Sequence, residues 1–338
     1  MTRPGLAFLV VVLLSVLTAL TMPLAAEAQT GKVYRVALIF TTSPVSEMAE
    51  PEPTHPGARA FVRGLRALGY VEGQNLILEH RSAEGRFDRF GDIVRELVAG
   101  KVDVIVTTAN PTTREARRAT TTTPIVMAFS VDPVGFGLVA SLARPGGNVT
   151  GLSGDAGPGL EGKQLELLKE ALPKIARVAL LGSRSEWESP RGQSVRAAAP
   201  ALGLTLLHAE SAPNDYTGAF TTIERERPDA LFVGAFGPDL YANRQRIVEF
   251  ATRNRLPVMA WSRDFTEVGG LMSYGVNVAD LYRRAAGYVD RILKGARPGD
   301  LPVEQPTAFE VVINLKTAKA FGLTISPAVL ARADEVVQ

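Results

Sequence analysis

Short apolar runs alternate with amphipathic segments along most of the sequence, and this alternation limits the fold more than any other feature. Residues 103–107 and 125–129 have the apolar character of strands that are buried on both faces of a sheet. A segment with a helical pattern, residues 112–119, lies between them. Because a strand–helix–strand order favours parallel βαβ units, we predict an α/β fold with parallel sheets.

The alternation stops near Ser153 and then starts again. The 338 residues are enough for two domains of ordinary size, so we predict two doubly wound parallel-sheet lobes. The predicted strands are residues 32–40, 75–81, 103–107, 125–129, 148–153, 177–181, 204–209, 229–233, 257–260, 270–274 and 309–313. The predicted helices are residues 58–68, 87–99, 112–119, 134–142, 160–172, 190–202, 216–225, 240–254, 277–295 and 315–321.

The run from residue 124 to residue 151 combines several signals of a ligand site. After its strand, Asp132 suits the N-cap and Pro133 the first position of a helix over residues 134–142. Ligands of open α/β sheets bind at the carboxyl ends of strands, near helix N-termini. We therefore expect ligand contacts at residues 129–132.

The first 28 residues have the pattern of a signal peptide. Arg3 precedes an apolar run at residues 6–20, and Ala26, Glu27 and Ala28 form a small-residue cleavage site. We expect cleavage after Ala28 and export of the mature chain, most simply into a bacterial periplasm. An uncleaved membrane anchor is the competing interpretation, because the apolar run is long enough for one.

Composition and motifs argue against several classes of function. The formal net charge is +2, so near to balance that we predict no nucleic-acid partner. The chain has no cysteine, which excludes disulfides, thiolate zinc sites and cysteine nucleophiles. Its three histidines are too scattered for a metal motif, and the dinucleotide and P-loop glycine motifs are missing. We therefore predict no catalytic residue, no metal and no cofactor.

Residues 130–151, SVDPVGFGLVASLARPGGNVTG, resemble the DPVG…GLV.SLARPGGN.TG signature of a family of ABC-transporter substrate-binding proteins. The resemblance extends over nearly the whole mature chain. Further matching stretches are residues 63–81, 163–173, 269–275, 282–327 and 330–337. The family consists of periplasmic receptors with the type I two-lobe fold, and its members include receptors for aromatic amino acids. The resemblance implies a non-enzymatic component of an ABC importer, with an inner-membrane permease as its partner.

The resemblance also implies how the chain is divided. In type I binding proteins, the helix predicted at residues 277–295 packs back on the first lobe. We expect hinge segments near residues 151–154, 274–277 and 303–307. The first lobe then comprises residues 32–152 plus 276–303, and the second lobe residues 153–275 plus 304–338.

Two other functions stay open at this point. One is a periplasmic ligand-sensing subunit of a signalling receptor, and the other is an enzyme on a doubly wound fold, which the missing catalytic motifs disfavour. In each case the partner is a small molecule, and we expect a monomer that closes around it. An aromatic or branched amino acid is the leading ligand, with a sugar, a purine-like heterocycle or an aromatic acid as alternatives.

Small polar and aromatic side chains follow the predicted strands of both lobes, as expected for a cleft that orients a small ligand. The candidate ligand-binding residues are Thr41, Thr42, Thr108, Asn110, Phe129, Ser130, Asp132, Trp187, Phe236, Asp239, Trp261, Arg263 and Tyr274. A proline-rich loop at residues 41–55 is longer than a usual βα connection, and is either functional or a solvated flap.

Each candidate has a structural alternative. The hydroxyl groups suit a ligand carboxylate, and equally suit turns and caps. Asp132 and Asp239 suit an ammonium group or a helix N-cap. Arg263 suits an anion or a surface ion pair. The aromatic candidates suit an apolar or aromatic ligand body, and Trp261 and Tyr274 are favoured because they lie at strand ends.

Overall fold

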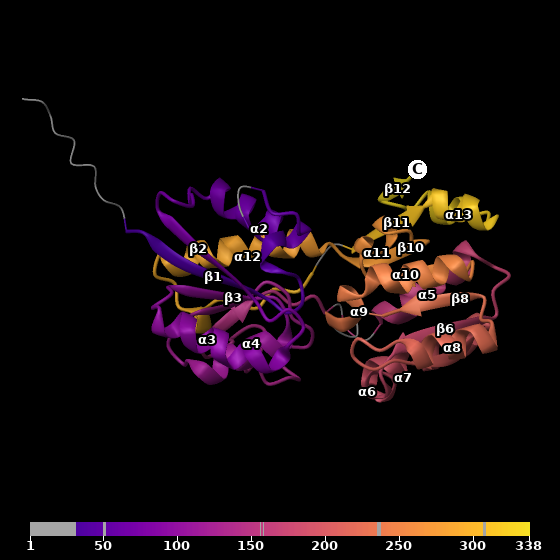
Figure 1. Cartoon of the computed structure of the whole chain (residues 1–338), viewed down its shortest axis with the longest axis horizontal. Helices are drawn as coiled ribbons and strands as arrows, with labels where there is room; N and C mark the ends of the chain where they lie inside the picture. Colours follow the sequence, from indigo (N-terminus) through magenta and orange to yellow (C-terminus); the bar gives the residue numbers. More distant parts are fainter. Residues whose placement is uncertain (1–31, 50–51, 156, 158, 235–237, 307–308) are drawn as a thin grey trace, which may run out of the picture. The chain divides into compact units, whose positions relative to one another are not determined.

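The central strands of the first sheet have apolar side chains on both faces, while one edge strand carries the polar Glu79, His80 and Arg81. Its members are β1 (Tyr34–Phe40), β2 (Leu76–Ser82), β3 (Val104–Thr107), β4 (Ile125–Met127) and β5 (Val149–Gly151), in the spatial order β2-β1-β3-β4-β5. All neighbouring pairs are parallel. This computed structural model describes residues 32–49, 52–155, 157, 159–234, 238–306 and 309–338 (Figure 1).

Helices cover both faces of the first sheet (Figure 1). The helices α2 (Pro56–Ala67) and α12 (Val278–Leu293) pack together on one face, in a core that includes the buried Phe61. The helices α3 (Phe90–Ala99) and α4 (Asn110–Ala119) cover the other face. The late position of α12 in the sequence shows that the chain returns to the first lobe after building most of the second.

The second sheet is larger and mixed. Its members are β6 (Arg177–Gly182), β7 (Thr205–Glu210), β8 (Ala230–Val233), β9 (Val258–Ala260), β10 (Met272–Val276), β11 (Phe309–Asn314) and β12 (Glu335–Val337), in the order β12-β11-β10-β9-β8-β6-β7. All pairs are parallel except β10 with β11. The predicted parallel-sheet lobe is therefore present, and the one antiparallel pair arises because β10 leaves the sheet toward the first lobe and β11 returns from it.

Helices also cover both faces of the second sheet (Figure 1). They are α5 (Leu160–Ala171), α6 (Arg184–Glu188), α7 (Pro190–Ala198), α8 (Thr217–Glu226), α9 (Pro238–Ala242), α10 (Arg244–Arg253), α11 (Arg263–Glu267), α13 (Leu315–Phe321) and α14 (Pro327–Leu330). Short 3-10 turns complete the chain at η1 (Val45–Glu47), η2 (Phe87–Arg89), η3 (Pro200–Leu202) and η4 (Pro298–Asp300). The two α/β lobes of the predicted type I architecture are therefore present.

Two of the segments that connect the lobes run side by side. Leu152 forms a parallel bridge with Glu304, and the Ser153 amide donates to the Glu304 carbonyl over 2.9 Å. Gly154 follows, and a Cβ atom at this position would lie 2.2 Å from the Phe129 ring. Only glycine therefore lets the first connection pass so close to this ring. Residues Tyr34–Gln338, which include both lobes, cluster into one compact unit.

Two predicted helices differ from the structure. Residues 134–142 form successive turns instead of a helix, because Asp132 (φ 45°) and Gly137 (φ 64°) adopt left-handed backbone angles that interrupt a helical path. The helix predicted at residues 240–254 is divided at Asn243 into α9 and α10. The other predicted helices are present with shifts of a few residues at their ends.

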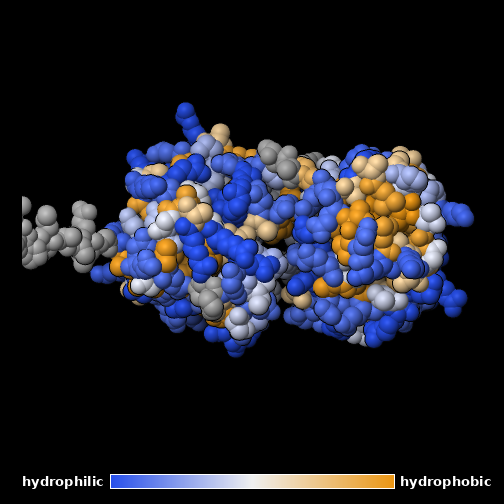
Figure 2. All heavy atoms as spheres, turned by 90° about the horizontal axis from the view of Figure 1, so that it is seen from above, coloured by the Kyte–Doolittle hydropathy of each residue, from blue (hydrophilic) through white to orange (hydrophobic). Residues whose placement is uncertain are grey.

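Three features of the chain concern its localisation: the molecular surface, possible membrane-spanning helices and the predicted signal peptide. Figure 2 shows one face of the molecule, on which hydrophilic side chains predominate and apolar side chains gather in a patch on the second lobe. Within the described residues, no helix has both the length and the apolar character that a membrane span requires. The predicted signal peptide lies outside the described residues and stays a prediction.

Candidate functional site

A cleft of about 860 Å³ is lined by residues of both lobes. In the first lobe the lining residues follow β1, β3 and β4, at the carboxyl ends of parallel strands where α/β folds bind ligands. In the second lobe they come from α6, α7, α9 and the residue after β9. The volume lies within the usual range of small-molecule sites.

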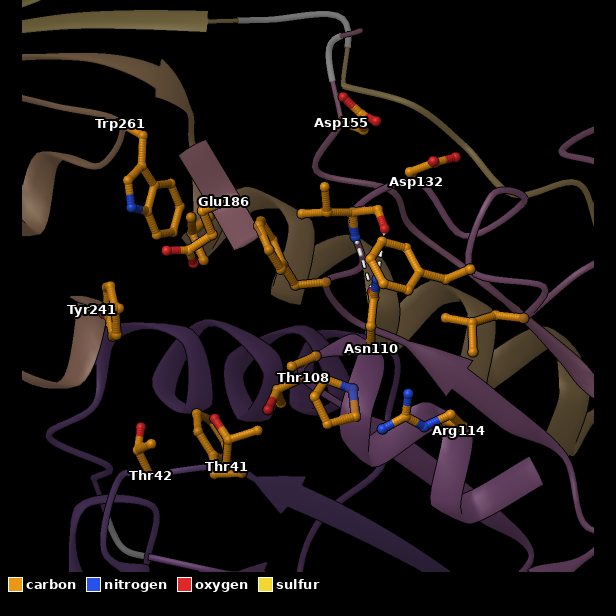
Figure 3. Close-up of a pocket in the computed structure, with 18 of the residues that line it drawn as sticks. Thr41, Thr42, Thr108, Asn110, Arg114, Asp132, Asp155, Glu186, Tyr241 and Trp261 are labelled. Carbon is orange, nitrogen blue, oxygen red and sulfur yellow. Dashed lines mark hydrogen bonds between the residues drawn. The ribbon is translucent and has the colours of Figure 1, made fainter. Parts of the chain in front are cut away.

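The structure brings seven of the predicted residues into the lining of this cleft. They are Thr41, Thr42, Thr108, Asn110, Phe129, Asp132 and Trp261. Six of them belong to the first lobe, where the rule about strand ends applies most directly. Their side chains are drawn with other lining residues in Figure 3.

Aromatic rings from both lobes contact one another in the lining of the cleft, and we call this connected set the aromatic wall. Its members are Phe40, His55, Phe129, Tyr241, Trp261 and Tyr282. The centroids of neighbouring rings lie between 4.5 Å and 6.4 Å apart. Rings at these separations attract one another in tilted or edge-to-face arrangements, and together offer a large apolar surface to a ligand.

The two rings from the second lobe are held firmly. The Tyr241 hydroxyl donates to the Asp264 carboxylate over 3.0 Å, and the Ser262 hydroxyl donates to the same oxygen over 2.8 Å. Burial and the Asp264 charge raise the pKa of Tyr241 above its usual value, so this phenol stays protonated. Trp261 is packed against Gly275, where a Cβ atom would lie 1.8 Å from the Trp261 carbonyl oxygen. The Tyr241 ring and the Trp261 backbone are therefore held in place beside the cleft.

Asn110 holds the turn that follows β4. Its side-chain carbonyl accepts from the Ser130 hydroxyl over 2.7 Å and from the Val131 amide over 3.1 Å. Its side-chain N–H group donates to the Val131 carbonyl over 2.6 Å (Figure 3). Ser130 is fully buried and lies outside the cleft lining. These contacts fix the turn that carries Phe129 and Asp132.

Charged side chains lie across the cleft from Tyr241 and Trp261. Arg114, Asp132 and Asp155 are on this charged side (Figure 3). Asp132 accepts from the Gly135 amide over 2.9 Å, so it caps a turn where we had expected it to cap a helix. Both signs of charge are therefore available to a ligand at this side.

Arg191 connects the charged side to the interior of the second lobe. One of its terminal nitrogens lies 3.3 Å from Asp155 Oδ1, and its Nε lies 2.9 Å from Glu161 Oε1. The Glu161 side chain is 1% exposed, and burial raises the pKa of this carboxyl even though Arg191 opposes the shift. The pair ties α7 to the start of α5 beside the first connection between the lobes.

The three predicted threonines of the cleft lining differ in whether their hydroxyl groups already form a hydrogen bond within the protein. Thr108 donates its hydroxyl hydrogen to the Ile39 carbonyl over 3.0 Å. The hydroxyl oxygen of Thr108 can therefore accept a hydrogen bond from a ligand but has no hydrogen left to donate to one. The structural alternative named for this hydroxyl is therefore present, and a ligand contact of Thr108 stays a prediction. Thr41 is buried at the end of β1, and Thr42 is half-buried beside it. Both line the cleft without a hydrogen bond from their hydroxyl groups to another described residue.

The remaining candidates lie away from the cleft lining. Trp187 stacks on His208 with ring centroids 4.6 Å apart, and Tyr274 packs against Phe309. Asp239 accepts from the Tyr216 hydroxyl and from the Asn214 amide. Arg263 pairs with Glu267, Glu310 and Glu335, which is the surface ion pair named as its alternative. Phe236 lies outside the described residues.

Sequence reasoning missed several lining residues, of which His55 is the most informative. Its Nδ1 accepts from the Gly57 and Ala58 amides over 3.1 Å and 3.3 Å, so His55 is the N-cap of α2. Met48, in the same loop, is fully buried in the core of the first lobe. The described part of the proline-rich loop is therefore anchored at Met48 and His55 and lines the cleft at residues 41–43 and 55, while residues 44–46, 49, 52 and 54 are exposed. Histidine directly before Pro56 was an available N-cap signal.

Within the described residues, no group of three or more His, Cys, Asp or Glu side chains is arranged to hold a metal ion. The arrangement instead suits an organic ligand. An apolar or aromatic body can lie against the aromatic wall while polar groups reach the charged side.

The sequence is similar to known proteins over most of its length. A family model described as ABC transporter substrate binding protein matches residues 54–337. The tyrosine-binding protein of Clostridioides difficile (strain R20291) is 27% identical over 290 residues, which cover 82% of this chain and 80% of that protein.

Solved structures are similar as well. A conserved domain protein from Vibrio cholerae O1 biovar El Tor has a TM-score of 0.79 and 29% identity, and covers 90% of this chain and 100% of its own. An ABC domain from Streptococcus pneumoniae, solved in complex with L-Trp, has a TM-score of 0.77 and 28% identity, with coverage of 91% and 100%. The branched-chain amino acid binding protein LivJ of Streptococcus pneumoniae, at 14% identity and a TM-score of 0.54, covers 80% of this chain and 86% of its own and shares the fold alone.

Proposed function

Because the chain belongs to the family of ABC transporter substrate-binding proteins, we propose that it captures a small molecule in its cleft for the permease of an ABC importer. The ligand is an amino acid with an aromatic side chain, and the site of action is the periplasm. The signal-peptide pattern of residues 1–28 supports export.

The position of Arg114, Asp132 and Asp155 across the cleft from Tyr241 and Trp261 carries this proposal, with Glu186 as one further carboxylate beside Trp261 (Figure 3). An aromatic amino acid has a zwitterionic head and a flat apolar body. The aromatic wall matches the body, while the carboxylates and guanidinium groups of the charged side match the head (Figure 3). The tyrosine-binding relative and the structure in complex with L-Trp support the same class of ligand.

Closure of the lobes is the proposed mechanism. A ligand that lies between the aromatic wall and the charged side contacts both lobes at once, so its binding energy favours the closed conformation. The connections near residues 151–154, 274–277 and 303–307 serve as hinges, and the lobes divide as residues 32–152 plus 276–303 and 153–275 plus 304–338. The permease then distinguishes the closed form from the open form.

Calorimetric titration of the mature chain tests this function. The ligands are L-phenylalanine, L-tyrosine, L-tryptophan, L-leucine, benzoate and glucose, and we expect saturable binding of at least one aromatic amino acid. Trp261→Ala should weaken that binding about tenfold or more, because it removes one face of the aromatic wall.

Tyr274→Ala is the matched control, since this ring packs on Phe309 outside the cleft lining. Circular dichroism verifies that each variant is folded. Binding of glucose or benzoate in place of every amino acid would contradict the proposed ligand class. An equal loss of affinity in both variants would show that the ligand does not lie against the aromatic wall.

A further inference from the structure

We propose that His55 is a specificity-determining residue of the cleft. Its ring presents one fixed N–H donor to the ligand, and so selects an aromatic ligand that carries a hydrogen-bond acceptor on its ring over one that does not. This inference rests on the proposed function, because it concerns how the same cleft distinguishes between aromatic ligands.

The hydrogen bonds of His55 determine which ring nitrogen carries the proton. Nδ1 accepts from the backbone amides of Gly57 and Ala58, at 3.1 Å and 3.3 Å. A ring nitrogen that accepts hydrogen bonds has no proton of its own, so in the neutral ring the proton is on Nε2. Nε2 is therefore a donor only, and cannot accept a hydrogen bond from a ligand.

The His55 ring is also fixed in space. Its side chain is buried, with 7% of the residue exposed, and its ring centroid lies 4.5 Å from that of Phe40 in an edge-to-face contact. Tyr282 and Tyr241 lie 6.3 Å and 6.4 Å away. The His55 amide donates to the Glu47 carbonyl over 2.9 Å, which fixes the backbone. The donor is therefore preorganised before a ligand arrives.

The Nε2 edge of the ring remains available to a ligand. Nδ1 faces the start of α2, so Nε2, on the other side of the ring, is directed away from that helix. No residue in the described ranges accepts a hydrogen bond from Nε2, and this atom is not sealed in the interior. Because His55 lines the cleft, the free N–H group belongs to the part of the aromatic wall formed with Phe40, Tyr241 and Tyr282.

This single donor distinguishes between aromatic side chains. A phenol oxygen on the ligand ring can accept from Nε2–H. An unsubstituted phenyl ring leaves the donor desolvated and without a partner when the cleft closes, which is unfavourable. An indole or aniline N–H group is itself a donor and does not satisfy it. Burial lowers the pKa of His55 to about 4, with Asp264 and Arg244 as the nearby charges, so the ring stays a neutral donor near neutral pH.

Titration with matched ring substituents tests the proposal. The probes are L-phenylalanine, L-tyrosine and 4-amino-L-phenylalanine, which differ only at one ring position. We expect the wild-type chain to bind tyrosine at least about tenfold more tightly than phenylalanine, and to bind the amino derivative no better than phenylalanine. In His55→Ser, serine can still cap α2 but offers no ring donor, and the preference for tyrosine should fall to about twofold or less.

The outcomes separate this inference from the function on which it rests. Equal affinities of the wild-type chain for phenylalanine and tyrosine would overturn the role of His55 while leaving an aromatic amino-acid receptor in place. A tyrosine preference that persists in His55→Ser would do the same. Absence of binding to any aromatic amino acid would overturn the proposed function itself. Equal affinities in the wild-type comparison would overturn the role of His55 without any variant. If His55→Ser fails to fold, His55→Asp, which can also cap α2 and offers no N–H donor, takes its place in the same comparison.

Discussion

Acidification should destabilise this protein through His55. Burial lowers the pKa of the folded His55 side chain from 6.5 to about 4, with Arg244 acting in the same direction and Asp264 against it. Between these two values the unfolded chain binds a proton that the folded chain does not. The free energy of unfolding therefore falls as the pH falls from about 6.5 to about 4, and the contribution is fully present only above that window.

The size of this effect follows from the shift. Each unit of pKa difference corresponds to about 1.4 kcal/mol. Protonation of His55 across the whole window should therefore lower the free energy of unfolding by about 3 kcal/mol. Most of that loss, about 2 kcal/mol, should occur between about pH 7 and about pH 4.5. Protonation would also convert Nδ1 from an acceptor into a donor that faces two backbone amides, which would remove the N-cap of α2.

Urea unfolding followed by circular dichroism measures the effect, with wild type and His55→Ser compared at both pH values. The two other histidines, His80 and His208, are present in both proteins, so their contributions cancel in the difference. Wild type should lose about 2 kcal/mol more than the variant on acidification. An identical loss in both proteins would refute the reasoning, because it would mean that His55 titrates equally in the folded and unfolded states.

Two further pairs of variants test the packing around the cleft. Gly275→Ala should lower the free energy of unfolding by about 2 kcal/mol and weaken ligand binding, because the new Cβ would lie 1.8 Å from the Trp261 carbonyl oxygen. Gly287→Ala places no atom within 4 Å of the new Cβ, so it should stabilise α12 by about 0.5 kcal/mol. Thermal melts distinguish the two, and equal melting temperatures would contradict the close contact. Arg191→Met should cost about 3 kcal/mol in urea unfolding, because it leaves the buried Glu161 unpaired. Arg332→Met removes the exposed ion pair with Glu170 and should lower the free energy of unfolding by less than about 1 kcal/mol. A similar loss of stability in both variants would show that burial of Glu161 does not determine the effect of Arg191→Met.

The elements of the fold could be predicted because their signals are local. Buried strands such as β3 and β8 are short apolar runs, and α12 has a regular apolar face, so each is visible in a window of a few residues. The turns at residues 134–142 were mistaken for a helix because Asp132 and Pro133 have the pattern of a helix start. The left-handed backbone angles of Asp132 and Gly137 interrupt the helix, and the helix-start pattern carries no signal of them.

The cleft was predictable on the side of the first lobe and less so on the other. The rule that ligands bind at strand ends correctly placed residues after β1, β3 and β4 in the lining. In the second lobe, Tyr241 lies on the short helix α9, which sequence patterns merged with α10. Tyr274 was misplaced because alternate residues of a strand face opposite ways: Tyr274 packs on Phe309, while its neighbour Gly275 faces the Trp261 carbonyl.

The two tryptophans offer the most direct measurement of where the ligand binds. Trp261 lies in the cleft lining and Trp187 lies outside it, so Trp187→Phe and Trp261→Phe each leave a single fluorescent reporter. With L-tyrosine or L-phenylalanine as the titrant and selective excitation of tryptophan, the chain that retains Trp261 should show a saturable change in emission. The chain that retains Trp187 should show little or none. A saturable change from Trp187 with none from Trp261 would place the ligand outside the cleft and contradict the account.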